Sequence, residues 1–157
     1  MAEYRFLTSW LLDCERERAW EVLQDTVRWP EWWQGVVSVD ELDPGDANHL
    51  GGRYRIAWRS RLPYPLEFEF EVDQVDRPSV MAGAARGELQ GTGRWRLFEQ
   101  DGVTAVLYEW NVATTKPWMN LLAPLARPVF AWNHDVVMGW GGEGLARRLG
   151  VRLLAAG

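Results

Sequence analysis

His134, Tyr54 and Tyr108 are the side chains of this sequence best suited to acid–base chemistry in an apolar setting. His134 falls on the apolar stripe of a predicted helix over 128–149, so we expect it to face a sheet. A buried histidine can transfer protons near neutral pH, and a phenol in an apolar cavity can orient a ligand carbonyl or hydroxyl. The alternative, which we favour for His134, is a neutral core residue that donates to a backbone or tyrosine oxygen. The two tyrosines can equally be core residues.

A regular series of acids over 66–73 has a structural explanation rather than a catalytic one. Apolar residues and acids alternate one by one there, which predicts a strand with one buried face and one wet face. Ion pairs with arginines on neighbouring strands are therefore expected. The acids are Glu67, Glu69, Glu71 and Asp73, and the candidate partners are Arg53, Arg55, Arg59, Arg94 and Arg96.

Metal and cofactor chemistry has little support in the sequence. The two histidines, His49 and His134, and the single cysteine, Cys14, form no HxxxH or CxxC pattern. One cysteine also excludes an intramolecular disulfide. The glycine pairs at 51–52 and 141–142 lack the strand, glycine-rich loop and helix of a nucleotide site. We therefore expect no metal and no cofactor.

The tryptophan content is unusual, with eleven in 157 residues. Either the core is heavily aromatic, or some rings wall a cavity for a flat or apolar ligand. Trp29, Trp32 and Trp33 lie at short helices and either gate the cavity mouth or fill the core. Alternation along strands and helical spacing predict a ligand-binding set that consists of Tyr54, Trp58, Phe68, Phe70, Trp95, Tyr108, Trp110, Phe130, Asn133, His134, Val137 and Gly141.

A sheet and a long helix are needed to position these side chains. Nearly every predicted strand is apolar on one face only, and consecutive strands pair as hairpins, so the sheet is antiparallel. The helix, which we expect to begin at about Pro128, must cover the apolar face of the sheet. The predicted fold is α+β, with six to seven strands curved around a long C-terminal helix and a cavity between them. The patterns predict a first strand over 4–12, a helix that ends before Pro30, and a second short helix with Pro30 in its first turn. They also predict strands over 36–42, 53–60, 66–72, 79–85, 92–98 and 103–114.

Composition excludes several function classes. The formal net charge of −5 argues against a nucleic-acid partner, because phosphate binding needs a basic face. No apolar stretch approaches the ~20 residues that span a bilayer, so no integral membrane segment is expected. The N-terminus lacks the apolar run of a signal peptide, which makes a cytoplasmic location the expectation. A homodimer is compatible with the sequence.

Several short motifs occur in an order that resembles one superfamily. They are the helix Glu15 to Gln24 followed by Trp29-Pro30-Glu31-Trp32-Trp33, then Gly51-Gly52-Arg53-Tyr54, Gly91-Thr92-Gly93-Arg94-Trp95, Glu109-Trp110-Asn111-Val112, and Asn133-His134-Asp135-Val136-Val137-Met138 leading into Gly142-Glu143-Gly144-Leu145. Together they are similar to the START-related superfamily, also called SRPBCC, and most of all to its polyketide cyclase/dehydrase and lipid-transport branch. The resemblance covers nearly the whole chain. It implies a helix-grip fold and one START-like domain over 1–157.

Members of this superfamily bind lipids, sterols, hormones or polyketides, so the resemblance implies a hydrophobic ligand. The leading hypothesis is a binding or transport protein for a hydrophobic or aromatic small molecule, lipid or polyketide-like. The alternative is a polyketide cyclase/dehydratase, in which His134 with Tyr54 or Tyr108 moves protons. A third possibility, a protein-interaction module, requires an exposed apolar patch. The regular polar alternation of the strands argues against such a patch.

Overall fold

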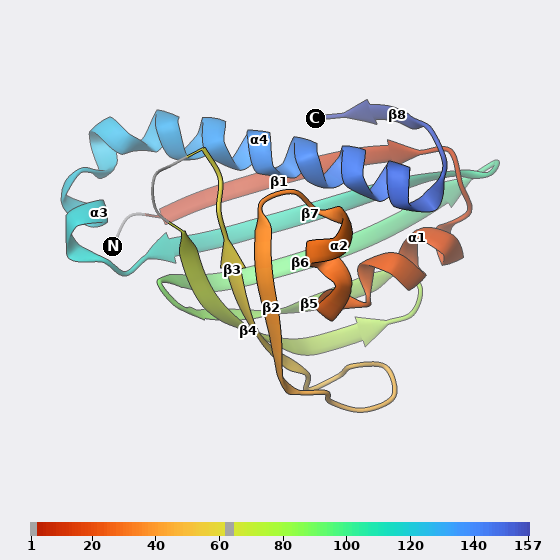
Figure 1. Ribbon diagram of the computed structural model, residues 1–157, viewed down its shortest axis with the longest axis horizontal. Coiled ribbons are helices and arrows are strands. Elements are labelled where there is room, and N and C mark those ends of the chain that lie inside the picture. Colours follow the sequence, from red (N-terminus) through yellow and green to blue (C-terminus); the bar gives the residue numbers. More distant parts are fainter. Residues whose placement is uncertain (1–2, 62–64) are drawn as a thin grey trace.

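The computed structural model describes residues 3–61 and 65–157 and has an α+β fold (Figure 1). An eight-stranded antiparallel sheet with the order β2-β3-β4-β5-β6-β7-β1-β8 curves around the long helix α4. The elements are β1 (Glu3–Leu12), α1 (Arg16–Leu23), the 3₁₀ helix η1 (Thr26–Arg28), α2 (Trp29–Trp32), β2 (Val36–Asp43), β3 (Arg53–Trp58), β4 (Leu66–Asp76), β5 (Val80–Gly87), β6 (Leu89–Gln100), β7 (Val103–Thr114), α3 (Pro117–Leu121), α4 (Ala123–Leu149) and β8 (Leu153–Ala156).

The predicted architecture is confirmed, but the short helix α3 was not predicted and two further details differ. The sheet gains β8, which follows α4 and pairs with β1 along Trp10 to Leu12. This short strand has no alternating pattern, so only its position beside β1 makes it a strand. The predicted start of the long helix at Pro128 is wrong, because α4 begins at Ala123. Pro128 lies in the second turn, where its missing N–H leaves only one helical hydrogen bond unmade.

Five tryptophans fill one half of the space between the sheet and α4. This tryptophan core consists of Trp10, Trp29, Trp32, Trp33 and Trp95, all at most 7 % exposed. Trp33 is its centre, with ring centroids 5.6 Å from Trp10, 5.2 Å from Trp29 and 6.0 Å from Trp95. The indole N–H groups of Trp33 and Trp10 donate to the carbonyls of Val137 and Met138 at 2.9 and 3.0 Å. These rings therefore fill the core and do not gate a cavity.

Glycines on α4 allow this close packing. A Cβ at Gly144 would lie 1.9 Å from the carbonyl oxygen of Trp32, and one at Gly141 would lie 2.6 Å from the Trp33 ring. Either contact is shorter than real Cβ contacts, so the helix can approach α2 only with glycine at these positions.

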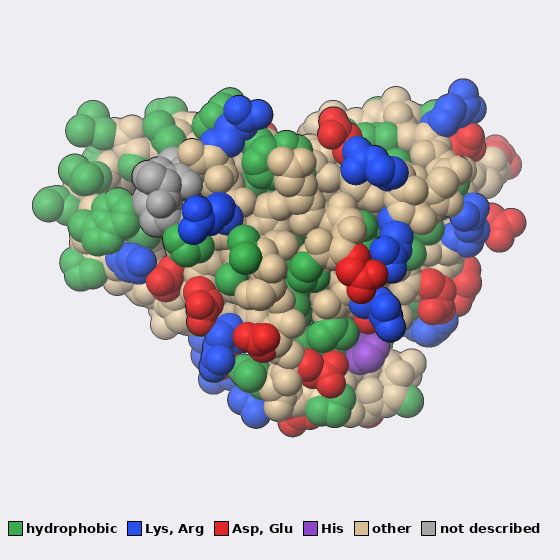
Figure 2. All heavy atoms as spheres, viewed as in Figure 1, with side chains coloured by type: hydrophobic (Ala, Val, Ile, Leu, Met, Phe, Trp, Pro, Cys, Tyr) green, Lys and Arg blue, Asp and Glu red, His purple; other side chains and the backbone are tan. Residues whose placement is uncertain are grey.

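One surface contradicts the expectation that no apolar patch is exposed. Figure 2 shows hydrophobic side chains gathered at the end of the molecule formed by α3 and the start of α4. We call this surface the apolar tip, defined as Trp118, Leu121, Leu122, Leu125, Val129 and Trp132, each at least 45 % exposed.

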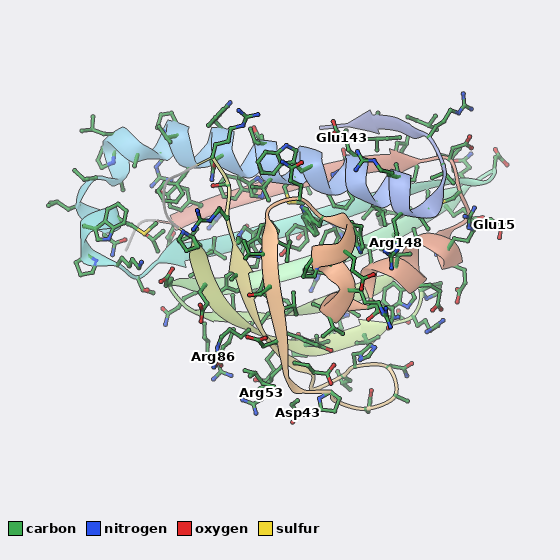
Figure 3. The ribbon with its side chains drawn as sticks, viewed as in Figure 1. Glu15, Asp43, Arg53, Arg86, Glu143 and Arg148 are labelled. Carbon is green, nitrogen blue, oxygen red and sulfur yellow. The ribbon has the colours of Figure 1, made fainter. Side chains whose placement is uncertain are left out.

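The outer face of the sheet carries the charges, as alternation predicts. Arg55 pairs with Glu67 and Glu69 across β3 and β4, and Arg86 pairs with Glu71 across β4 and β5. Arg53 and Arg86 project away from the concave side (Figure 3). The expectation of cross-strand ion pairs is thus confirmed for Glu67 and Glu69, whereas Glu71 pairs with Arg86, which was not among the expected partners. Each pair is exposed enough to contribute little to stability.

Candidate functional site

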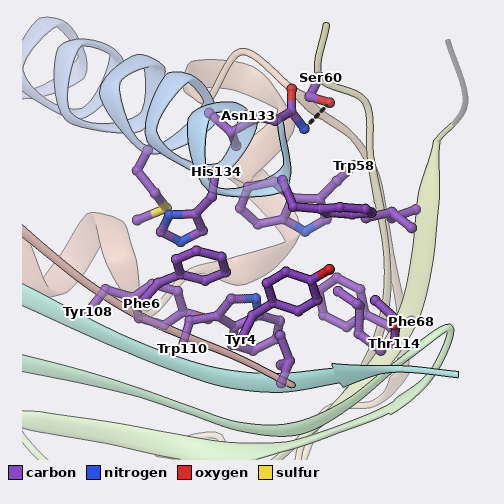
Figure 4. A pocket seen from close by; sticks show the side chains of 16 residues that line it. Tyr4, Phe6, Trp58, Ser60, Phe68, Tyr108, Trp110, Thr114, Asn133 and His134 are labelled. Atoms are coloured by element: carbon purple, nitrogen blue, oxygen red, sulfur yellow. Dashed lines mark hydrogen bonds between the residues drawn. The ribbon is translucent and has the colours of Figure 1, made fainter. Parts of the chain in front are cut away.

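A small apolar cavity lies in the other half of the space between the sheet and α4. Its volume is about 90 Å³, and it is bounded by the N-terminal half of α4 and by strands β1, β3, β4, β6 and β7 (Figure 4). Its wall consists of Tyr4, Phe6, Trp58, Ser60, Leu66, Phe68, Leu89, Tyr108, Trp110, Val112, Thr114, Phe130, Asn133, His134, Val137 and Met138. None of these is an acid, a lysine or an arginine.

Most of the predicted ligand-binding residues lie on this wall. They come from β3 and β4, from β7, and from the inward face of α4. They are Trp58, Phe68, Tyr108, Trp110, Phe130, Asn133, His134 and Val137.

Four predicted residues lie outside the cavity: Tyr54, Phe70, Trp95 and Gly141. Trp95 belongs to the tryptophan core, and Gly141 lies against the Trp33 ring. Alternation identifies the inward face of a strand but not which end of that face borders empty space.

Tyr54 and Phe70 pack further along the sheet. The Tyr54 side chain is buried, and its hydroxyl lies 3.5 Å from Nδ1 of His49 in the loop before β3. Phe70 is partly buried against Gly83 of β5, where a Cβ would meet its ring at 2.7 Å. Both side chains therefore contribute to packing beyond the cavity.

Sequence reasoning missed the contribution of β1. Tyr4 and Phe6 lie opposite Val112 and Trp110 of β7, which places both rings on the cavity wall. The alternation of Tyr4, Phe6, Thr8 and Trp10 marks their common face, but nothing in the sequence places β1 beside β7. Thr114 was likewise not singled out as a wall residue, because it is the last residue of β7.

Three wall residues carry buried polar atoms that have no hydrogen-bond partner among the described residues. These atoms are the Tyr4 hydroxyl, the Trp58 indole N–H and both ring nitrogens of His134. Unpaired buried polar groups are rare in folded proteins because each costs about 1–3 kcal/mol. Their convergence on one cavity is typical of a ligand site, in which the ligand supplies the missing partners.

His134 is held by packing rather than by hydrogen bonds. Its ring stacks on Phe6, with centroids 3.9 Å apart and planes inclined by 12°. Nδ1 lies 3.6 Å from the carboxylate of Asp135, which is beyond hydrogen-bonding distance. The expected bond to a backbone or tyrosine oxygen is therefore not present. Burial lowers the pKa of His134 to about 4, so the imidazole is neutral at pH 7.

The two predicted acid–base tyrosines stay protonated near neutral pH. Burial, reinforced by the carboxylates of Glu41, Asp25 and Asp43, raises the pKa of Tyr54 to about 12. Burial also raises the pKa of Tyr108, which lies on the cavity wall. Desolvation similarly raises the pKa of Tyr4, an effect that the nearby guanidinium of Arg127 reduces. The cavity therefore offers neutral polar groups only.

Asn133 connects α4 to the strand side of the cavity. Its amide N–H donates to the hydroxyl of Ser60, and its carbonyl oxygen accepts the backbone N–H of Arg61 at 3.3 Å (Figure 4). The amide predicted as a ligand contact is thus occupied by these two bonds, which fix the position of α4 beside the cavity.

Metal binding finds no support among residues 3–61 and 65–157, which contain no group of three or more His, Cys, Asp or Glu side chains placed to hold an ion. The same residues contain no helix that is both long and apolar enough to cross a membrane.

Comparison with known proteins identifies the fold. No protein-family model matches the sequence, and neither does the sequence of any curated protein. Among solved structures, the Zhui aromatase/cyclase from a Streptomyces species superposes with a TM-score of 0.78 at 14% identity, over 95% of this chain and 94% of that one. A Thermus thermophilus protein gives 0.74 at 16% identity, over 94% and 97%.

A START superfamily protein from Mycobacterium smegmatis also superposes, with a TM-score of 0.74 at 10% identity over 93% of this chain and 97% of that one. All three matches cover nearly the whole of both chains, so the likeness extends from β1 to α4. Together with the curved sheet around α4, they show that this chain has the helix-grip fold of these structures.

Proposed function

We propose that this protein binds a neutral, largely apolar small molecule in the cavity between the sheet and the N-terminal half of α4. The observation that carries the proposal is the set of unpaired polar atoms on Tyr4, Trp58 and His134 in an otherwise apolar wall. Trp58 can only donate, Tyr4 can donate or accept, and neutral His134 has one donor and one acceptor. A ligand with an apolar body and a hydroxyl or carbonyl oxygen matches this set.

The absence of charge on the described wall favours a neutral ligand. A carboxylate or ammonium group would lose its hydration in the cavity without an opposite charge to pair with, which is costly. Burial of the ligand's apolar area, at about 25 cal/mol per Å², supplies the driving force. The polar groups then set the orientation.

Cavity size limits the ligand. The volume of about 90 Å³ is below the roughly 150 Å³ of an engineered cavity that accepts benzene. Even a single ring therefore requires some widening, and a lipid or polyketide-like ligand requires more. The tryptophan core is densely packed, so the widening would fall on the N-terminal half of α4, whose hydrogen bonds through Asn133 to Ser60 and Arg61 would then have to break.

The cyclase/dehydratase alternative is supported by a single residue. Neutral His134 lies on the wall with both nitrogens unpaired, so it can accept a proton from a bound polyketone. A pKa of about 4 makes it a weak base at neutral pH, since efficient general bases have a pKa near the working pH. Several of the similar structures are aromatase/cyclases, but that likeness carries the fold and not the reaction.

Thermal unfolding with matched probes tests the binding proposal. Phenol supplies an apolar ring and a hydroxyl, toluene supplies the ring alone, and benzoate supplies the ring with a charge. We expect phenol to raise the unfolding temperature most, toluene less, and benzoate not at all, because only phenol pairs with the unpaired groups without desolvating a charge. Equal shifts for the three probes, or no shift with phenol, would overturn the proposal.

A further inference from the structure

The apolar tip is an exposed surface that the cavity does not explain. Leu121 and Leu125 are 81 % and 80 % exposed, and Trp118 and Trp132 are both about half exposed. Figure 2 shows that these hydrophobic side chains gather at one extreme of the molecule's longest axis. Large exposed apolar residues next to one another mark interaction surfaces, whereas single ones need no explanation.

Helix α4 changes character along its length. In its N-terminal part, Phe130 faces the cavity while Leu125, Val129 and Trp132 are exposed, so this part carries apolar side chains on its inward and on its outward side. The C-terminal part has an ordinary polar outer face, with residues such as Glu143 and Arg148 (Figure 3). A surface helix normally carries polar residues on the side away from the core, and the exposed leucine, valine and tryptophan side chains here depart from that pattern.

The charge around the apolar tip differs from that of the whole chain. The chain has a formal net charge of −5, yet residues 110–134 contain no acid and two cations, Lys116 and Arg127. Lys116 pairs with Glu88 at 3.1 Å, whereas Arg127 forms no ion pair with any described carboxylate. Arg127 instead donates to the carbonyl of Glu3 and lies over the Tyr4 ring, beside the cavity.

We infer that the apolar tip docks on the surface of a phospholipid bilayer. Leucines with two tryptophans, an arginine and no acid are the residues that favour the interface between headgroups and acyl chains. The tip is a narrow end of the molecule formed by α3 and the first turns of α4 (Figure 1), which suits shallow insertion. A second copy of the chain is the less favoured occupant, because a stable dimer buries about 800 Å² on each partner over a broader complementary surface.

Docking would bring the cavity to the lipid surface, because Phe130 on the cavity wall lies next to Val129 of the tip on the same turn. Docking on a bilayer goes beyond ligand binding and is tested without any cavity ligand. Failure of the docking test would therefore leave the ligand-binding proposal untouched, and the reverse also holds.

Co-sedimentation with vesicles tests the inference. The full chain is mixed with phosphatidylcholine vesicles, with or without phosphatidylglycerol, and the bound fraction is measured. We expect binding to both, stronger with the anionic lipid, and at least tenfold weaker partitioning of the double variant Leu121→Asp/Leu125→Asp. Both side chains are exposed, so this variant should fold, which its circular dichroism and unfolding midpoint will verify.

The matched control is Phe98→Asp/Leu154→Asp. Both side chains are exposed, and Phe98 lies near the β6–β7 hairpin, far along β7 from α3. This variant should bind vesicles like the wild type. Absence of wild-type binding, or equal loss in both variants, would overturn the inference. A wild-type dimer that becomes monomeric in the tip variant, with no vesicle binding, would assign the tip to self-association instead.

Discussion

Burial gives His134, on the cavity wall, a lower pKa in the folded chain than in the unfolded chain. Its pKa of about 4 lies below the ordinary 6.5, so the unfolded chain binds this proton more readily than the folded chain does. The free energy of unfolding is therefore unaffected by His134 above pH 6.5. It decreases as the pH falls from 6.5 toward 4, because protonation of this histidine then favours the unfolded chain. At pH 5 the reduction relative to pH 7 should be about 2 kcal/mol.

Urea unfolding of the wild type and His134→Phe at both pH values measures this effect. The variant should lose less stability on acidification, because its ring cannot be protonated. The matched control, His49→Gln, removes the histidine outside the cavity. An unchanged pH dependence in His134→Phe would show that the imidazole is not held neutral by burial.

Tyr4 offers a second test at the scale of one atom. Tyr4→Phe removes an unpaired buried hydroxyl, so the free energy of unfolding should stay the same or rise by up to about 1 kcal/mol. Phenol affinity should fall several-fold, because the ligand loses a partner. Tyr54→Phe, whose hydroxyl lies outside the cavity, should leave phenol affinity unchanged. If Tyr4→Phe instead lowers the free energy of unfolding by as much as the loss of a hydrogen bond would, the hydroxyl already has a partner and is not available to a ligand.

At the residue scale, the sequence could predict which faces turn inward but not what each side chain meets. Trp58, Trp110 and Trp95 all follow from alternation, yet two border the cavity and the third fills the core. The difference depends on where the tryptophans of α2 and β1 lie in space, which no local pattern encodes. The sequence could not predict that the ring nitrogens of His134 have no hydrogen-bond partner among the described residues. That property depends on which side chains from other elements lie beside the ring.

At the scale of elements, α4 and its glycines provide a paired prediction. Gly139→Ala places a methyl group in open space and should stabilise the helix by up to about 1 kcal/mol. Gly144→Ala places it against the Trp32 carbonyl and should destabilise the protein by more than about 2 kcal/mol. Thermal unfolding of both variants checks the sign of each change. Stabilisation by Gly144→Ala would show that α4 does not pack this closely on α2.

Elements with a strong period were predictable, and elements without one were not. β4 alternates cleanly and was expected within a few residues of its observed bounds. The start of α4 was missed because Pro124 and Pro128 suggested a break, although both fit within its first two turns. β8 exists only because α4 returns the chain to β1.

At the scale of the whole molecule, packing divides the space under α4 into two parts. The tryptophan core makes one half rigid and leaves the other half with a small cavity, exposed helix turns and unpaired polar groups. This division explains how a heavy tryptophan content and a cavity, the proposed ligand site, occur together in one small chain. It also places the cavity and the apolar tip at the same end.

Calorimetric titration of phenol into the wild type and Val112→Phe tests this account most directly. Val112 is a buried wall residue of β7, and a larger ring there fills the cavity. The account predicts saturable heat for one phenol per wild-type chain and none for Val112→Phe, with both proteins folded by their unfolding midpoints. The same saturable heat in both proteins, or none in the wild type, would contradict it.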